Sequence, residues 1–302
     1  MRIHCLCLVR DEADILGHTL DAALQWAHAI YVLDNGSSDG TWELLQDYAK
    51  THSRVLLLGR EYGPYRSSLW GEMANEISGK VKKRDWWCRL DADEIYVDDP
   101  RHFLARMSAR SEVVYSASIQ YYFTDIDLAA YERDPSEYTR EWKPERLRYY
   151  RTNWSEPRFV RHTSRARWTG EWPPSFRNMR PACTRIRLRH YQYRSPPQIE
   201  RRVRTRITRT QADRFSHEKT SSWVPIGLRQ EDLVFPNSAA KESSLWRTRV
   251  VKASALHRDE GNDDFQIDWE LLPTMGEPQP FLTRVLGRVR AVWRRSLLAG
   301  LR

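Results

Sequence analysis

The sequence is poor in cysteine and lysine, and no long apolar run is present. Among its 302 residues only four are cysteines, and their spacing fits neither a CxxC pair nor a Cys/His zinc site. We therefore expect small buried thiols rather than metal ligands. No uninterrupted stretch approaches the roughly 20 apolar residues that cross a bilayer. Internal repeats and low-complexity tracts are also absent. The four cysteines are Cys5, Cys7, Cys88 and Cys183.

The beginning of the chain does not have the pattern of a signal peptide. Its apolar run is short, and the acidic residues Asp11 and Glu12 follow it at once. We read this run as a first strand and expect a cytoplasmic protein. Hydrophobic residues make up 40% of the chain and 13 residues are tryptophan, which favours a packed core over disorder. The length suits one large domain with additions.

Basic charge is concentrated in one part of the chain. Of the 49 basic residues 41 are arginine, a bias that by itself says little about function. Residues 1–110 have a net charge of −3, whereas residues 140–210 have a net charge of +15. This asymmetry predicts a nearly neutral catalytic core followed by a segment that faces something anionic. Nucleic acid, a lipid-linked phosphate and a membrane surface all qualify.

Apolar runs and amphipathic stretches alternate through the first 90 residues. Three such repeats at βαβ spacing predict a doubly wound parallel sheet, an α/β fold. Ligands of such sheets bind beyond the carboxyl ends of the strands. The predicted strands are 3–9, 29–33, 54–58 and 86–90, and the predicted helices are 16–27, 41–50 and 66–79.

After Pro100 the pattern loosens. We expect strands over 112–123 and 185–193, and a basic helix that begins at Ser195-Pro196-Pro197 and ends near Phe215. The predicted organisation has four parts: an α/β core over 1–125, a basic part of the same domain over 126–215, an irregular extension over 216–280, and a basic amphipathic helix over 281–302.

Acidic residues follow two of the predicted strands. Asp34 ends the second strand, and Asp91-Ala92-Asp93 follows the fourth. Two carboxylates one residue apart can point into one cleft and hold a hard divalent cation. Such a cation needs further oxygen ligands, which a nucleotide diphosphate supplies. An isolated DxD is common by chance, but its place after a buried strand favours a functional reading.

Three stretches of the chain match one known pattern: Val9–Leu16 (VRDEADIL), Tyr31–Thr41 (YVLDNGSSDGT) and Arg89–Glu94 (RLDADE). They resemble glycosyltransferase family 2, whose members have the GT-A fold. The resemblance covers about residues 3–125 and implies a doubly wound mixed sheet. It also implies that the core over 1–125 binds a nucleotide sugar and that the part over 126–215 is the acceptor side of the same catalytic domain.

One element departs from the family pattern. Met73-Ala74-Asn75 lacks the arginine that members often have there, and Arg66 on the same predicted helix is a substitute.

The resemblance implies roles for five residues. Asp34 would accept hydrogen bonds from the base or ribose of the donor. The plain alternative is that Asp34 is an acid in a helix-capping loop. Arg10 would lie over the nucleotide, and Glu12 would support the same loop; an ordinary surface arginine and a first-turn acid are the plain alternatives. Asp91 would contact the ribose or a metal-bound water, and Asp93 would bind Mn²⁺ or Mg²⁺ directly.

Members of the GT-A class often take a further metal ligand from the C-terminal half, commonly a histidine. His190 is our candidate because it ends a predicted strand just before the basic helix. A structural histidine packed among tyrosines is the alternative reading. His162 and His257 are weaker candidates.

An inverting transfer needs a general base that deprotonates the acceptor hydroxyl. Our candidate is Glu171, which follows the DxD by 78 residues and has Trp168 and Trp172 nearby for stacking on a sugar. A surface-loop acid is the alternative reading of Glu171. The competing candidates for the base are Glu156, Asp125 and Asp127.

The sequence therefore predicts a metal-dependent inverting glycosyltransferase. Its donor would be a nucleoside-diphosphate sugar, with a UDP-sugar favoured, and its acceptor a saccharide or a lipid-linked glycan. The basic, aromatic-rich second half suggests a nucleic-acid-binding protein as the alternative, but that reading leaves the acids at the strand ends unexplained, and no nucleic acid is expected. A nucleotidyltransferase would need a Gly-rich basic loop after the first strand, where Arg10-Asp11-Glu12 stands instead.

The last residues predict where the enzyme acts. Apolar residues at helical spacing over 281–301, including Trp293, lie beside several arginines. This pattern suits a helix on an anionic membrane surface, and docking of the same stripe onto the catalytic domain is the alternative. We expect a peripheral enzyme on the inner face of the plasma membrane, in the synthesis of a cell-surface polysaccharide or lipopolysaccharide.

Overall fold

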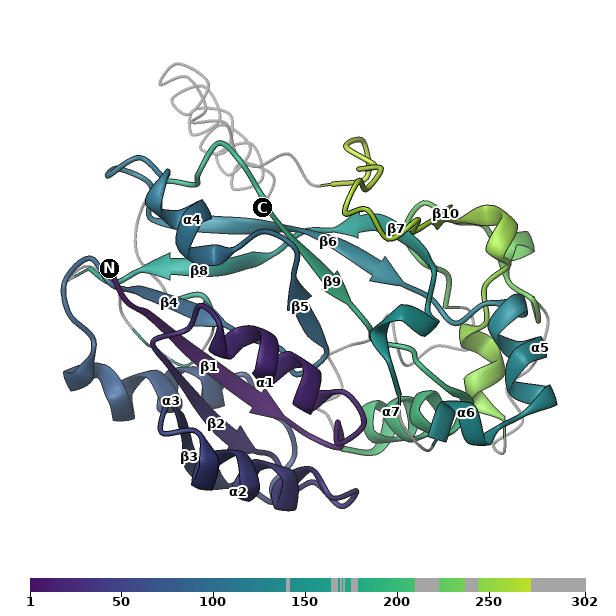
Figure 1. The fold of residues 1–302 in the computed structure, drawn as a ribbon, viewed down its shortest axis with the longest axis horizontal. Helices are drawn as coiled ribbons and strands as arrows, with labels where there is room; N and C mark the ends of the chain where they lie inside the picture. Colours follow the sequence, from purple (N-terminus) through teal and green to yellow (C-terminus); the bar gives the residue numbers. More distant parts are fainter. Residues whose placement is uncertain are drawn as a thin grey trace, which may run out of the picture. The chain divides into compact units, whose positions relative to one another are not determined.

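A mixed β-sheet runs through the protein, and its first half is parallel (Figure 1). β1 (Ile3–Val9) pairs with β2 (Ala29–Asp34) on one side and with β4 (Trp86–Arg89) on the other, and β2 pairs with β3 (Val55–Arg60). All of these pairs are parallel, as the alternation of strands and helices predicts. The structure is a computed structural model and describes residues 1–139, 142–163, 168, 170, 172–174, 179–209, 223–236 and 244–272.

Helices cover both faces of the parallel half. In β1, Cys5 and Cys7 belong to the core that contains the apolar side of α1, whereas Leu6 belongs to the core that contains α3. Successive strand residues point to opposite faces, so a strand buried on both sides reads as a continuous apolar run. The predicted α/β fold is confirmed. These helices are α1 (Leu16–Leu24), α2 (Thr41–Thr51) and α3 (Ser68–Ile77).

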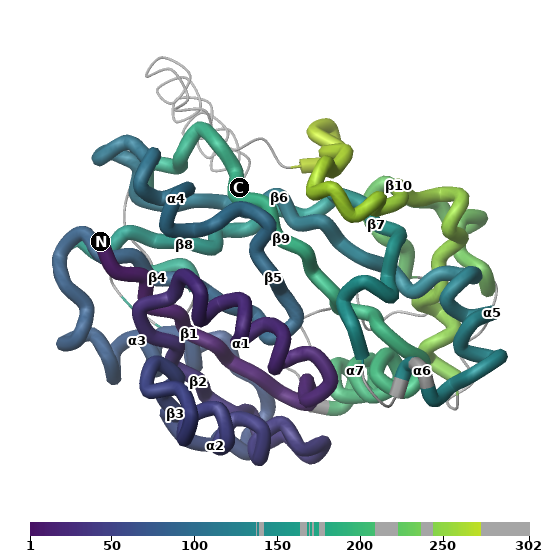
Figure 2. The backbone as a smooth tube through the Cα atoms, in the orientation of Figure 1, coloured from purple at the N-terminus to yellow at the C-terminus, as the bar shows by residue number. Residues whose placement is uncertain are grey.

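The second half of the sheet is mostly antiparallel. β8 (Pro157–Arg161) lies between β4 and β6 (Val113–Tyr121) and is antiparallel to both, and β7 (Tyr149–Trp154) continues the antiparallel pairing further along the same side of β6. β9 (Ile186–His190) runs parallel to β6 and antiparallel to β5 (Glu94–Tyr96). In Figure 2, β9 therefore runs beside β5, which brings residues almost one hundred positions apart into contact.

The remaining elements are short, apart from one long helix. α7 (Pro196–Arg209) begins at the proline pair, as predicted; residues beyond it, where we expected it to end, lie outside the described part. The others are α4 (Pro100–Ala105), α5 (Asp125–Arg133), α6 (Ser136–Thr139), β10 (His257–Arg258) and the 3-10 helices η1 (Ser78–Lys80), η2 (Pro144–Arg146), η3 (Gln230–Asp232), η4 (Leu245–Arg249) and η5 (Ala253–Ala255).

An aromatic core holds the second half together. It includes Tyr121, Phe123, Tyr150 and Tyr191, which are all buried, and the rings of Tyr121 and Tyr191 stack with centroids 4.7 Å apart. Large rings bury much apolar area with few rotatable bonds. They give this arginine-rich half a core in spite of its polar composition.

Two expectations from the sequence need correction. Three of the four cysteines are buried, but Cys183 is exposed because it lies in the bends between β8 and β9. The basic segment does not simply face an external anion either. Arg158 and Arg194 are fully buried, and Arg187 pairs with Asp98 at 2.7 Å. Acids elsewhere in the chain neutralise much of the positive charge.

Candidate functional site

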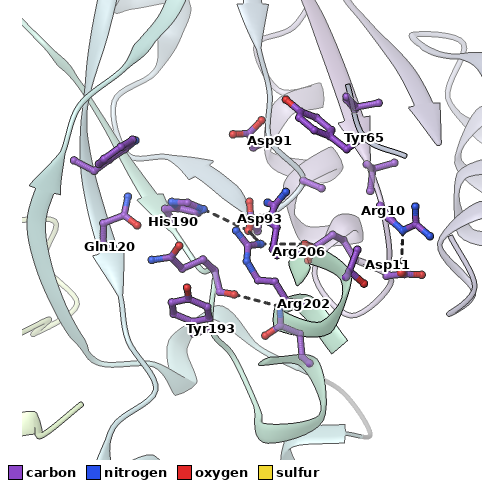
Figure 3. A pocket seen from close by; sticks show the side chains of 18 of the residues that line it. Arg10, Asp11, Tyr65, Asp91, Asp93, Gln120, His190, Tyr193, Arg202 and Arg206 are labelled. Carbon is purple, nitrogen blue, oxygen red and sulfur yellow. Dashed lines mark hydrogen bonds and ion pairs between the residues drawn. The ribbon is translucent and has the colours of Figure 1, made fainter. Parts of the chain in front are cut away.

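A cavity of about 620 Å³ opens at the carboxyl ends of β1 and β4, where sequence and topology both place ligands. Its other walls come from β6, β7, β9 and one face of α7. This volume is in the range of small-molecule sites. Figure 3 shows its polar wall, in which the labelled side chains are Arg10, Asp11, Tyr65, Asp91, Asp93, Gln120, His190, Tyr193, Arg202 and Arg206.

The two carboxylates of the DxD have different neighbours. Both oxygens of Asp91 accept hydrogen bonds from Arg89 at 3.0 Å, and one of them also contacts Arg158 at 2.9 Å. Burial acts to raise the pKa of Asp91, but the positive charges of Arg89 and Arg158 outweigh it and hold this pKa well below its usual range. Asp91 is therefore a charged residue that the protein already neutralises.

Asp93 meets His190 across the sheet. The pairing of β5 with β9 sets Glu94 opposite His190, and the backbone N–H of Tyr191 donates to the carbonyl of Asp93 at 2.9 Å. Asp93 Oδ2 consequently lies 3.4 Å from His190 Nε2 and 3.2 Å from Arg202 Nη1. Burial acts to raise the pKa of Asp93, but His190 and Arg202 outweigh it and lower the pKa.

This pair of side chains fits a divalent metal. Two ligands bound about 2.1 Å from one Mn²⁺ or Mg²⁺ at a right angle are about 3 Å apart, close to the 3.4 Å between Asp93 Oδ2 and His190 Nε2. Both side chains line the cavity. A carboxylate together with an imidazole favours Mn²⁺ over Mg²⁺, which binds oxygen almost exclusively.

The loop after β1 forms the opposite side of the cavity. Arg10 and Asp11 lie there (Figure 3), and a carboxylate oxygen of Asp11 accepts the backbone N–H of Ser38 at 2.7 Å. Glu12 is buried and pairs with Arg194. Burial raises the pKa of Glu12 to about 7, although the charge of Arg194 acts in the opposite direction.

Asp34 lies beside the cavity rather than in it. Its side chain is fully buried, accepts the backbone N–H and the hydroxyl of Ser37, and pairs with Arg60 at 2.8 Å. The next residue, Asn35, lines the cavity instead. Arg66 pairs with Glu72 and is not among the lining residues.

The structure distinguishes among the candidates for the general base. Glu171 lies outside the described residues. Glu156 lines the cavity, but it pairs with Arg89 and Arg158, whose charges outweigh the effect of burial and lower its pKa. Asp125 and Asp127 are not lining residues; Asp127 belongs to the capping box of α5.

The alternative histidines and the two tryptophans lie away from the cavity. Trp87 Nε1 donates to His162 at 3.0 Å, and His257 contacts Asp268 at 3.0 Å. Trp168 and Trp172 pack on the core that contains α3 instead of lining the cavity.

The residues that surround the acids were not predicted from the sequence. Arg89, Arg158 and Arg194 are internal counter-ions, and α7 presents Arg202 and Arg206 to the cavity. The α7 face could have been found from its spacing, because residues three and four positions apart share one side of a helix. Positions 198, 201, 202, 205 and 206 follow that rule and all line the cavity.

Comparison with known proteins identifies the family. The family model described as "Glycosyl transferase family 2" matches residues 8–167, more than half of the chain. The chain belongs to glycosyl transferase family 2. No match was found among curated proteins. The matched region of this family 2 member contains the β1 loop, the DxD and Arg158, but not His190 or α7.

Similarity to solved structures is low. TarS 1–349 of S. aureus is 11% identical, with a TM-score of 0.29, over 41% of this chain and 36% of that one. The mannosyltransferase PcManGT of Pyrobaculum calidifontis, solved with GDP-Man and Mn²⁺, is 16% identical, with a TM-score of 0.31, over 39% and 35%. The chain thus spans about a third of the length of these proteins. Within the described residues, no helix is long and apolar enough to span a membrane.

Proposed function

We propose that this family 2 member is a metal-dependent glycosyltransferase that uses a nucleoside-diphosphate sugar, with a UDP-sugar favoured. The observation that carries the proposal is the pair formed by Asp93 and His190, 3.4 Å apart at the carboxyl end of the parallel sheet. A metal held there supplies charge stabilisation to a departing diphosphate. Membership of the family supports glycosyl transfer as the reaction class. The cavity of about 620 Å³ supports a small-molecule ligand such as a nucleoside-diphosphate sugar.

The cationic side chains around this pair suit a diphosphate. Arg202 reaches Asp93, and Arg10, Arg201 and Arg206 line the same cavity. Guanidinium groups bind phosphate oxygens through paired N–H donors. In the proposed complex these arginines orient the diphosphate and stabilise its charge as the bond to the sugar breaks. Arg10 and Asn35 place the nucleoside at the end of β1, and Asp34 holds that loop through Ser37.

We assign the general base to Glu171 and propose inversion at the anomeric carbon. Of the described candidates, Glu156 fits this role poorly, since Arg89 and Arg158 keep its carboxylate paired and lower its pKa. An α-linked donor would then give a β-linked product. An NMR spectrum of the product distinguishes this β linkage from the α linkage that retention would give. Glu171→Gln should lower turnover more than donor affinity. A product with retained configuration would contradict this assignment.

We further propose a saccharide or lipid-linked acceptor and a place in cell-surface polysaccharide or lipopolysaccharide synthesis, on the cytoplasmic side of the membrane. The basic helix expected over 281–302, outside the described residues, would bring the enzyme to anionic lipid. We also propose that the chain has the four parts expected from the sequence: a nucleotide-sugar-binding core, a basic acceptor-side part, an irregular extension and a basic amphipathic helix. Arginines that face inward, such as Arg202 and Arg206, support a small anionic ligand over nucleic acid.

Nucleotide-dependent stabilisation tests the central proposal. We expect UDP to raise the melting temperature of the full-length protein in Mn²⁺ and, to a lesser extent, in Mg²⁺. EDTA should remove the effect, and added Mn²⁺ should restore it. GDP and dTDP serve as alternative nucleotides. If no nucleoside diphosphate stabilises the protein with either metal, the proposal fails.

A further inference from the structure

Three acidic side chains beside the DxD surround one arginine. Asp91, Glu94 and Glu156 each offer an oxygen, and these atoms lie within 4.8 Å of one another. By distance alone this arrangement could hold a metal ion. The guanidinium of Arg158 contacts all three carboxyl groups, including Asp91 at 2.9 Å.

The position of Arg158 is fixed by burial. Its side chain is completely inaccessible, as is that of Glu94. A buried guanidinium is costly to desolvate unless carboxylates surround it, and buried carboxylates are equally costly without a cation. Arg158 extends from β8, which lies next to β4, so the sheet itself delivers this positive charge to the end of the DxD strand.

Guanidinium groups occupy the space among these three carboxyl groups. Arg158 contacts all of them, and Arg89 pairs with both Asp91 and Glu156. A divalent cation that bound the three carboxyl groups would have to displace the guanidinium of Arg158.

The arrangement restricts what Asp91 can do. A carboxylate oxygen has about two lone-pair sites. Asp91 Oδ2 uses both, with Arg89 and Arg158, while Oδ1 uses one with Arg89. Among the contacts of the described residues, one acceptor site on Oδ1 is left for a substrate hydroxyl. Asp93 has a different set of neighbours and keeps the metal-binding position beside His190.

We propose that Arg158 is a positioning residue that takes the place of a second divalent cation among Asp91, Glu94 and Glu156. It fixes Asp91 as a hydrogen-bond acceptor and leaves Asp93 and His190 to bind the single metal of the site. The identity of that single metal site rests on the proposed function; the role of Arg158 among the three carboxyl groups does not.

Counting bound Mn²⁺ tests this inference. Electron paramagnetic resonance of free Mn²⁺, measured with UDP and the full-length protein, should give one bound ion per chain for the wild type and two for Arg158→Ala. Arg158→Lys should stay at one, because the ammonium keeps a positive charge in the cluster. The double variant Arg158→Ala/Glu94→Gln should return to one, because the new site then lacks a carboxylate.

Matched controls make each outcome decisive. Arg187→Ala removes an arginine that pairs with Asp98 outside the cavity, and it should add no ion. A folded Arg158→Ala that binds no additional Mn²⁺ overturns the inference. If that variant does not fold, Glu94→Gln alone decides, since loss of the wild-type ion in Glu94→Gln would mean that the cluster holds the metal. A wild type with no ion and an Arg158→Ala with one would support the inference and refute the proposed metal site.

Discussion

Asp91 and Asp93 are separated by one residue, yet they differ in what they can bind. Asp91 is held by two guanidinium groups, whereas Asp93 faces an imidazole and one arginine. The difference arises because the strand from Glu94 onward turns to pair with β9 and so brings His190 to Asp93. The chemistry of the motif is therefore divided between its two carboxylates.

The metal assignment leads to a prediction for the pair of ligands. Asp93→Asn keeps the shape of the side chain but removes its charge, so Mn²⁺-dependent stabilisation by UDP should disappear while the fold persists. His190→Ala should weaken Mn²⁺ affinity by roughly tenfold to a hundredfold. Thermal shift with titrated Mn²⁺ measures both. His162→Ala, whose ring lies against Trp87 outside the cavity, is the control. An Asp93→Asn protein with an unchanged Mn²⁺ response would contradict the assignment.

Arg202 provides a second prediction at this scale. It contacts both Asp93 and Glu12 from one face of α7, and its guanidinium lines the cavity. A charged hydrogen bond to a diphosphate contributes about 1.5–3 kcal/mol, so Arg202→Met should weaken UDP binding roughly tenfold to a hundredfold. Isothermal titration in Mn²⁺ gives the affinity. Arg187→Met should bind UDP like the wild type, and equal affinities for the two variants would remove Arg202 from the donor site.

The site is positioned by strands that are hard to recognise from the pattern of apolar residues in the sequence. β5 has three residues, and β7 and β8 lie in a stretch where arginine, proline and aromatic residues obscure any alternation. β8 nevertheless carries Arg158, and β9 carries His190. A central strand that pairs on both sides is held by its neighbours' hydrogen bonds, so its own propensity matters less. The functional side chains are placed by these pairings.

The cap of α5 predicts a dependence of stability on pH. Asp127 accepts the backbone N–H of Thr124 at 2.9 Å, and burial raises its pKa from 3.8 to about 6. Between these values the folded state keeps a proton that the unfolded state releases. This group's contribution to stability is therefore present below pH 4 and is lost as the pH rises through 6, by about 3 kcal/mol in total.

Asp127→Asn removes this titration while it keeps an acceptor oxygen for the cap. The free energy of unfolding of the variant, measured relative to the wild type by urea denaturation, should increase between pH 4 and pH 7. Asp125→Asn, at the exposed start of the same helix, serves as the control. A difference that does not change with pH would mean that Asp127 titrates in its ordinary range.

At the scale of the whole molecule, the described residues up to Leu272 belong to one compact unit. Truncation after Pro280 therefore leaves the compact unit intact. We expect the truncated protein to bind UDP with Mn²⁺ as the full chain does. It should no longer sediment with anionic liposomes, because it lacks the basic amphipathic helix that the sequence predicts over 281–302. Neutral liposomes are the control. Equal sedimentation of both proteins would refute the membrane role of this helix.

The sequence by itself determined the parallel half of the sheet and the position of the DxD. Strands such as Ile3–Val9 are buried on both faces, so their apolar runs are visible without any knowledge of their partners. The carboxyl ends of such strands meet at one edge, which put the acids near a ligand site before any contact was known.

Only the tertiary structure decided which residues surround those acids. His190 and Arg158 are far from the DxD in sequence, and they reach it through strand pairing that depends on the whole sheet. The charge pattern led to the expectation that the basic segment faces an external anion. A net charge counts an arginine in the same way whether it faces solvent or a buried carboxylate. Burial and the charges of neighbouring groups set the direction in which the pKa values of Asp91, Glu94 and Asp93 shift. Both are properties of the folded chain.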